Sequence, residues 1–192
     1  MINLNYFNNK KIVSIILVLL LCLSACSDEN DVEKEDDKKL NLQEISFPKS
    51  SIDNKSFDIK TYNDEILLIN FWFPSCPPCI YELDILNRLD NNYDSVNVLG
   101  IQALGLDTKE DGFLMMEKKG VSYKSIADED ENIMNQLKIN VFPTTILYDQ
   151  KGNEIKRWIG IIDEDVVAEK IFEIGIKSVS YTHLTLPTNR EV

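Results

Sequence analysis

The sequence predicts an α/β protein built around one mixed sheet, and three observations lead to this prediction. Along residues 40–175, short apolar runs of strand length alternate with stretches whose apolar residues recur every three or four positions. The runs at 66–72 and 96–104 are almost continuously apolar, as expected for strands that are buried on both faces. Two strand-like segments, 143–148 and 154–160, flank a short turn and should form an antiparallel edge.

The first elements of the chain each have a local signal. Short strands are expected at 45–47 and 57–59, on either side of the turn sequence Asp53-Asn54-Lys55, and they predict an N-terminal hairpin. After the strand at 66–72, a helix is expected from about residue 77 to 89 because one apolar stripe runs along it. The stripe consists of Ile80, Leu83, Leu86 and Leu89.

The remaining elements follow the strand at 96–104. A helix over 109–119 should end at Gly120, because glycine readily adopts the backbone conformation that terminates helices. A brief strand at 125–127 and a short helix at 130–137 come next. After the antiparallel edge, a last helix over 163–174 should direct four apolar side chains inward. These are Val166, Val167, Ile171 and Ile174.

Length and charge limit the classes of protein that are possible. The chain has 192 residues, enough for one domain with a full core and hardly enough for two. Its formal net charge is −12. Binding to a phosphate backbone requires clustered Lys and Arg, so this composition argues against nucleic acid as a partner. The sequence contains no internal repeat and no glycine-rich phosphate-binding loop.

Residues 1–25 have the order of a bacterial export signal. Lysines at positions 10 and 11 precede an apolar run over 12–23, and small residues follow. The run is about a dozen residues long, whereas a membrane-spanning helix needs roughly 20. The stretch Leu23-Ser24-Ala25-Cys26 resembles a lipobox, which implies lipidation of Cys26 after cleavage. We therefore expect a lipoprotein signal peptide, with a plain secretory signal as the alternative.

Two further segments are expected to lie outside the folded domain at 40–177. Residues 26–39 are dominated by acidic side chains and contain almost no apolar residue beyond Val32, so they predict a disordered tether. A role of this acidic stretch in surface sorting is an alternative to that of a solvated spacer. Residues 178–192 resemble the in-frame translation of a sequencing adaptor, and we set them aside as an artefact.

The pair Cys76 and Cys79 is the chemical centre of the sequence. Cys22 should be lost with the signal peptide and Cys26 blocked by lipid, which leaves this pair. Cys76 follows a buried strand at the start of a helix, where free N–H groups and a partial positive charge stabilise a thiolate. Cys79 lies one turn further on, within reach for a disulfide. Pro77 and Pro78 suit the first helical positions, which lack hydrogen-bond partners for their N–H groups.

Three other interpretations of the pair compete with redox chemistry. A zinc site needs two more ligands, and the chain's one histidine, His183, lies in the segment set aside as an artefact. A static structural disulfide would close so small a loop that it adds little stability. Two inert thiols are unusual outside the cytoplasm. The position at a strand-to-helix junction favours a redox-active dithiol, and no metal or other cofactor is expected.

A second motif, Val141-Phe142-Pro143-Thr144-Thr145-Ile146, begins the strand expected at 143–148. With the Cys76-Pro77-Pro78-Cys79 motif, it makes residues 42–175 resemble the TlpA/ResA-like thioredoxin family of membrane-anchored thiol–disulfide oxidoreductases. The resemblance implies a thioredoxin-like fold: a central mixed sheet flanked by helices, with an extra strand-helix insert between residues 96 and 137.

The same resemblance assigns roles to single residues. Cys76 becomes the nucleophile and Cys79 the resolving cysteine. Pro143 becomes a cis-proline against the dithiol, and Phe142 the residue whose backbone docks a substrate strand, with Thr144 beside them. Acidic residues near the active site of the family's reductases suggest Glu82 as a proton acceptor, because the uncharged Asn70 cannot serve as one. The alternative for Glu82 is a solvated helix residue.

One departure from the family concerns the residue before the first cysteine, which is usually Trp and here is Ser75. Trp72 and Phe73 keep the region aromatic, so Trp72 and Ser75 are included among the expected substrate-binding residues. The docking surface beside Cys76 should be less bulky, which affects substrate preference more than chemistry.

The expected function is exchange of the Cys76–Cys79 disulfide with client proteins, as a reductase whose clients include apocytochrome c haem-site cysteines. The family implies protein thiol or disulfide substrates, a membrane electron donor such as a DsbD/CcdA-like protein, and a lipid membrane reached through Cys26. A peroxiredoxin-like peroxidase is one alternative, although Pro74-Ser75-Cys76 lacks the threonine that such an enzyme would want. A copper-delivery or other binding module is the second alternative.

Overall fold

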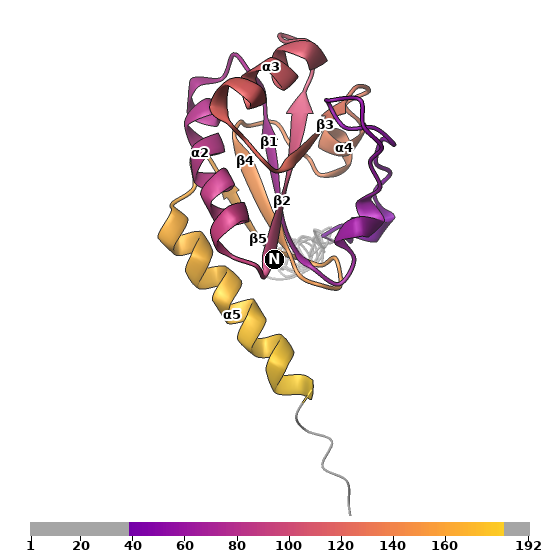
Figure 1. The fold of residues 1–192 in the computed structure, drawn as a ribbon. Helices are drawn as coiled ribbons and strands as arrows, with labels where there is room; N and C mark the ends of the chain where they lie inside the picture. Colours follow the sequence, from indigo (N-terminus) through magenta and orange to yellow (C-terminus); the bar gives the residue numbers. More distant parts are fainter. Residues whose placement is uncertain (1–38, 183–192) are drawn as a thin grey trace, which may run out of the picture. The chain divides into compact units, whose positions relative to one another are not determined.

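The computed structural model describes residues 39–182, which contain a five-stranded sheet in the order β3-β2-β1-β4-β5 (Figure 1). The strands are β1 (Ile66–Trp72), β2 (Val96–Ala103), β3 (Lys124–Asp128), β4 (Thr144–Tyr148) and β5 (Glu154–Ile159). β1 is parallel to β2, and β2 to β3, whereas β4 is antiparallel to both β1 and β5. The predicted mixed sheet with an antiparallel edge is therefore confirmed.

β1 is buried along its whole length, and its alternating side chains fill two hydrophobic cores. Leu68 and Trp72 belong to the core that includes both cysteines. Leu67, Ile69 and Phe71 belong to the core on the other face. A strand with helices on both sides has no solvent-facing positions, which explains its nearly continuous apolar sequence.

Helices cover both faces of the sheet (Figure 1). They are α2 (Pro77–Asn92), α3 (Lys109–Lys119), α4 (Asn132–Gln136) and α5 (Glu164–Thr182). Side chains of α2, α3 and α5 enter the core that contains the cysteines, and α4 packs into the opposite one with the segment that precedes β1. An ion pair of 2.7 Å between Arg88 and Glu164 links α2 to α5.

Most predicted helix boundaries agree with the structure to within a few residues. α3 has the predicted bounds, since Thr108 and Asp111 form a capping box at its start and Gly120 follows it with φ +64°. α4 is shorter than predicted: Asp128 accepts the N–H groups of Ile133 and Met134, so the helix begins later. The predicted inward position of Val166 is wrong, since 51% of this residue is exposed.

The strands predicted at 45–47 and 57–59 are not formed. The chain does reverse there, but the hairpin is reduced to one antiparallel bridge between Ser50 and Ser56. On either side the backbone forms short 3-10 helices, η1 (Leu42–Glu44) and η2 (Ile59–Tyr62). Asp58 caps η2 by accepting the Lys60 N–H at 3.0 Å. This local hydrogen bonding competes with strand pairing, while the apolar side chains still pack under the sheet.

Several predictions fall outside the described residues. These are the signal peptide at 1–25, the lipidation of Cys26, most of the tether at 26–39, and residues 183–192 of the suspected artefact. α5 continues to Thr182, eight residues beyond its predicted end at 174. Within the part of the chain that the structure describes, no helix is both long and apolar enough to span a membrane.

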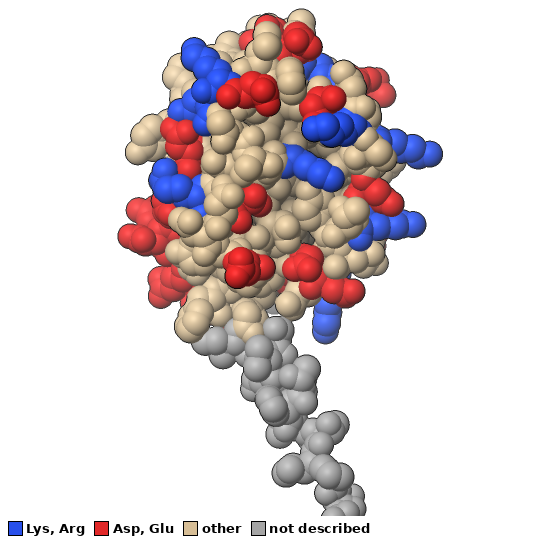
Figure 2. Space-filling model, in the orientation of Figure 1, with Lys and Arg blue, Asp and Glu red and all other residues tan. Residues whose placement is uncertain are grey.

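Charged side chains of both signs are mixed on the face of the molecule in Figure 2. The Lys and Arg side chains on this face do not form a continuous patch, in agreement with the net charge of −12. This face therefore offers no extended basic surface of the kind that binds a phosphate backbone.

Candidate active site

Cys76 and Cys79 form a disulfide at the start of α2. Cys76 is the N-cap residue, and its Sγ accepts the Cys79 N–H at 3.3 Å. Pro77 and Pro78 occupy the first two helical positions, as predicted. Cys76 is 5% exposed and Cys79 fully buried, so Cys76 is the residue of the pair that has any contact with solvent.

The Phe142–Pro143 segment lies at the same end of the sheet as the disulfide. Thr144 pairs with Phe71 near the end of β1, so the residues before β4 lie beside the loop that carries Cys76. The Phe142–Pro143 peptide bond is cis, as expected from the sequence. The Phe142 ring meets the Phe73 ring edge-on with centroids 5.2 Å apart, and both pack against the core that contains the two cysteines. The two rings therefore lie at the border of the core that contains the disulfide.

Glu82 is fully buried one helical turn beyond Cys79. Its Oε1 accepts the Ile162 N–H at 3.0 Å, and its Oε2 accepts the side-chain amide of Asn70 at 2.6 Å. The hydroxyl of Thr145 also hydrogen-bonds to this carboxyl group. Burial raises the pKa of Glu82 to about 7, and the three hydrogen bonds only partly oppose that rise. The interpretation of Glu82 as a solvated helix residue is therefore excluded.

Ser75 is exposed and held by a residue that sequence reasoning missed. Its N–H and its hydroxyl both donate to Oδ2 of Asp107, at 2.9 and 2.6 Å. Asp107 lies in the loop between β2 and α3, 32 positions further along the chain. The sequence gives no signal for this pair, because an aspartate before a helix already has a local explanation as part of the helix start.

Trp72 and Thr144, two of the expected substrate-binding residues, have side chains in the core. Trp72 is fully buried and its indole N–H donates to the Ser125 hydroxyl at 3.3 Å. Thr144 is 3% exposed and its hydroxyl donates to the Val141 carbonyl at 2.7 Å. At the edge of the site the aromatic side chains are instead those of Phe73 and Phe142, which are partly buried.

Two grooves of similar size border the disulfide loop. One, of about 350 Å³, lies on the Ser75 side and is lined by Pro74, Ser75, Asp107, Asp111, Leu114, Met115 and Lys118. The other, of about 360 Å³, is more apolar and is lined by Phe73, Ala103, Leu104, Gly105, Leu106, Glu131, Met134, Asn135, Ile139 and Phe142. A client segment at the disulfide would meet one or both grooves. Among the described residues, no cluster of His, Cys, Asp and Glu is arranged to hold a metal ion.

The mixed sheet, the disulfide at the start of α2 and the cis-proline before β4 define a thioredoxin-like fold with a Cys-x-x-Cys active site. The sequence profile of the Redoxin family matches residues 34–173, and the chain belongs to that family.

Relatives in sequence and structure agree with this assignment. The thiol-disulfide oxidoreductase ResA of Halalkalibacterium halodurans is 22% identical over 160 residues, which cover 82% of this chain and 89% of the relative. StoA from Bacillus subtilis superposes with a TM-score of 0.57 at 21% identity, covering 64% of this chain and 93% of StoA. The pneumococcal exposed lipoprotein thioredoxin Etrx1 from Streptococcus pneumoniae gives 0.56 at 18% identity, covering 66% and 98%. The structural similarities establish the fold.

Proposed function

We propose that this protein is an extracytoplasmic thiol–disulfide oxidoreductase that reduces disulfides of client proteins. The observation that carries the proposal is the Cys76–Cys79 disulfide at a helix start, with Cys76 slightly exposed and Cys79 fully buried. A helix N-terminus favours the thiolate of Cys76 once the pair is reduced. The enzyme class agrees with that of the ResA relatives, and the expected thioredoxin-like mixed sheet flanked by helices is confirmed.

The proposed reaction proceeds through a mixed disulfide. The Cys76 thiolate attacks a client disulfide and bonds to one client sulfur, while the other client sulfur leaves as a thiolate. The sulfur of Cys79 then attacks Cys76, displaces the client and closes the Cys76–Cys79 disulfide. Two electrons have then passed to the client. A membrane donor such as a DsbD/CcdA-like protein returns two electrons to the oxidised enzyme.

Glu82 has the properties required of the proton acceptor in this scheme. Cys79 is fully buried, so its proton cannot pass directly to solvent when it becomes a nucleophile. Glu82 lies one turn further along the same helix, and its pKa of about 7 lets it accept a proton near neutral pH. We assign Glu82 as the acceptor, and Phe142 and Ser75 as groups next to an incoming client.

We further propose that lipidated Cys26 holds the domain at the membrane. The supporting observation is the lipobox-like stretch Leu23-Ser24-Ala25-Cys26. The Leu42 N–H donates to the Gly152 carbonyl at 2.8 Å, and the Asn41 amide to the Lys151 carbonyl at 2.9 Å. These bonds fix the chain to the β4–β5 turn, which lies at the end of β4 remote from Thr144. The first described residues are thus held at the end of the sheet remote from Thr144, and we expect clients, among them apocytochrome c, to reach the disulfide at the other end.

Replacement of Cys79 with Ala tests the reaction. Without the resolving sulfur, the mixed disulfide on Cys76 should accumulate, and turnover of a protein disulfide should fall by orders of magnitude. Mass spectrometry of the trapped complexes, with Cys76→Ala as the matched control that traps nothing, measures this. In the reduced wild type, Cys76 should also alkylate faster than Cys79. Equal trapping by both variants, or efficient turnover of peroxide in place of protein disulfides, would overturn the proposal.

Replacement of Cys26 with Ala tests the anchor separately. In an expressing bacterium, the wild type should incorporate labelled fatty acid and sediment with membranes, because acyl chains bind the bilayer. The variant should appear without the label in the soluble fraction, with unchanged disulfide exchange. An unlabelled wild type would favour the plain secretory signal.

A further inference from the structure

The residue that precedes Cys76 is fixed by a carboxylate. Oδ2 of Asp107 accepts the Ser75 N–H at 2.9 Å and the Ser75 hydroxyl at 2.6 Å, so one oxygen holds both donors. Ser75 adjoins Cys76 in the sequence, and the Cys76 N–H is itself bonded to the Phe73 carbonyl at 3.2 Å. The loop that leads into the disulfide is therefore held from both sides of Ser75.

Asp107 lies directly before α3, and contacts at both ends hold this helix in place. The next residue, Thr108, caps α3 together with Asp111, and its carbonyl accepts the Gln102 side-chain amide at 2.7 Å. The end of α3 is tied to α2 through the ion pair of Lys119 with Asp84 at 2.5 Å. These contacts at both ends of α3 support the position of the Asp107 carboxylate beside the loop that carries Ser75.

The charges around Cys76 come from two sides. On the groove side, Asp107 and Asp111 line the same groove as Lys118, and the Asp111 carboxylate accepts the N–H and the hydroxyl of Thr108. On the core side, Glu82 lies buried below the helix start. The helix N-terminus favours a thiolate on Cys76, whereas a carboxylate bonded to the neighbouring residue disfavours it. Reduction of the disulfide creates that thiolate, so the Asp107 charge opposes reduction.

We propose that Asp107 is a positioning residue that holds Ser75 and, through its charge, lowers the reduction potential of the Cys76–Cys79 couple. The inference rests on the proposed function and deepens it, because a lower potential makes the reduced enzyme a stronger reductant of client disulfides. Ser75 contributes directly to the position of Asp107, because its hydroxyl donates the second hydrogen bond to that carboxylate. The negative charge beside the nucleophile thus favours electron transfer from the enzyme to the client.

The test is Asp107→Asn in the otherwise unchanged domain. The asparagine oxygen can still accept both Ser75 donors, so the variant removes the charge and keeps the hold on the loop. In the reduced protein, the pKa of Cys76 should fall by about half a unit, the order of magnitude for removing one nearby charge that solvent largely screens. The equilibrium with glutathione at pH 8 should shift about threefold toward the dithiol. Both are measured by alkylation resolved by mass spectrometry.

Glu110→Gln is the matched control. It removes the same charge from the first turn of α3, at an exposed position that does not line the groove. Asp107→Ala should show the asparagine effect together with a lower client rate, since it also releases Ser75. If Asp107→Asn leaves both readouts at the wild-type values, or moves them no more than Glu110→Gln does, the inference is wrong. Neither readout uses a client, so failure of the proposed function would appear separately, as absent client turnover.

Discussion

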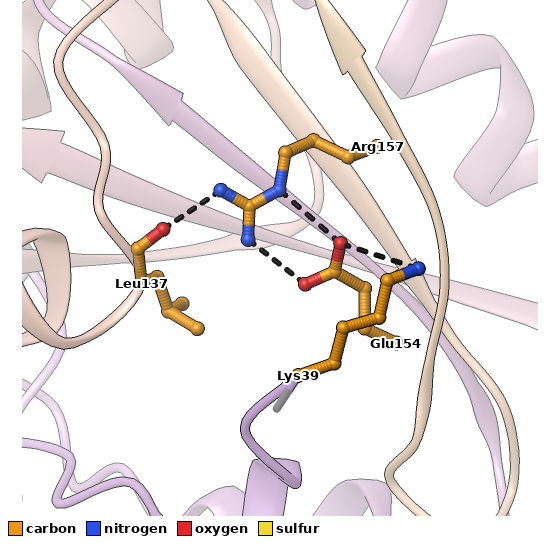
Figure 3. Close-up of polar contacts among 4 residues, drawn as sticks. All are labelled: Lys39, Leu137, Glu154 and Arg157. Atoms are coloured by element: carbon orange, nitrogen blue, oxygen red, sulfur yellow. Dashed lines mark hydrogen bonds and ion pairs between the residues drawn. The ribbon is translucent and has the colours of Figure 1, made fainter. Parts of the chain in front are cut away.

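Glu82 and Glu154 are two carboxylates withdrawn from solvent near opposite ends of the sheet, and they have different partners. Glu82 is fully buried, while the side chain of Glu154 is 5% exposed. The groups that hydrogen-bond to Glu82 are neutral: a backbone N–H, a side-chain amide and a hydroxyl. Glu154 instead faces the Arg157 guanidinium, which donates to both of its oxygens at 3.2 and 2.8 Å (Figure 3).

The two carboxylates therefore differ in how the protein balances their charge. Neutral donors stabilise a buried charge only in part, and the pKa of Glu82 therefore rises to about 7. Around Glu154 the charge is balanced by a cation in a bidentate arrangement. Arg157 also donates to the Leu137 carbonyl at 2.7 Å, so it ties β5 to the segment after α4. The first described residue, Lys39, approaches the same carboxylate at 3.9 Å.

The largest expected effect is on the pH dependence of stability, and Glu82→Gln should remove it. In the unfolded chain this carboxyl group loses its proton near pH 4.5, but in the folded protein it keeps the proton until about pH 7. Between these values the folded state binds more protons, so the wild-type free energy of unfolding falls as pH rises. The loss should be on the order of 3 kcal/mol, from about 1.36 kcal/mol per pKa unit.

Urea denaturation of the oxidised protein and the variant at pH 4, 5, 6, 7 and 8 measures this difference. Other titrating groups contribute equally to both proteins and cancel in the comparison. The glutamine should fit, because Asn70 Oδ1 has no hydrogen-bond partner among the described residues and can accept its amide. Parallel stability curves would contradict the titration of Glu82. If Glu82 also accepts the Cys79 proton, the variant should shift the pH profile of thiol reactivity.

Elements that have a clear signal within a few consecutive residues were predicted correctly from the sequence. The strand at 66–72, the helix that follows and the prolines after Cys76 each carry their own signal in a few residues. The N-terminal hairpin failed because Asp58 hydrogen bonds and short 3-10 turns prevail over weak strand propensity there. Trp72 was placed near substrate by its sequence position, but alternation along β1 turns it into the core.

Contacts between distant segments could not be predicted from such patterns. The hydrogen bonds from Asn70 to Glu82 and from Ser75 to Asp107 depend on how β1, α2 and the β2–α3 loop pack against one another. The periodicity of apolar residues within one element carries no information about such contacts between elements. A role of Glu82 near the active site was suggested by a family resemblance, and its burial could not have been derived from the helix alone, where a solvated glutamate fits equally well.

The smaller expected effect is a loss of stability on replacing Glu154. Glu154→Gln should destabilise the protein by about 1–2 kcal/mol, because the charge-assisted bonds to Arg157 weaken at a site that solvent partly screens. The slope of stability between pH 4.5 and 7 and the thiol reactivity profile should both stay at the wild-type values, since Glu82 is untouched. Urea denaturation at pH 7 measures the loss, and Lys156→Gln at an exposed position of β5 is the control, with a change below about 0.5 kcal/mol. A changed pH slope in Glu154→Gln would mean that the two ends of the sheet are electrostatically coupled, and the separation drawn between the two carboxylates would then be wrong.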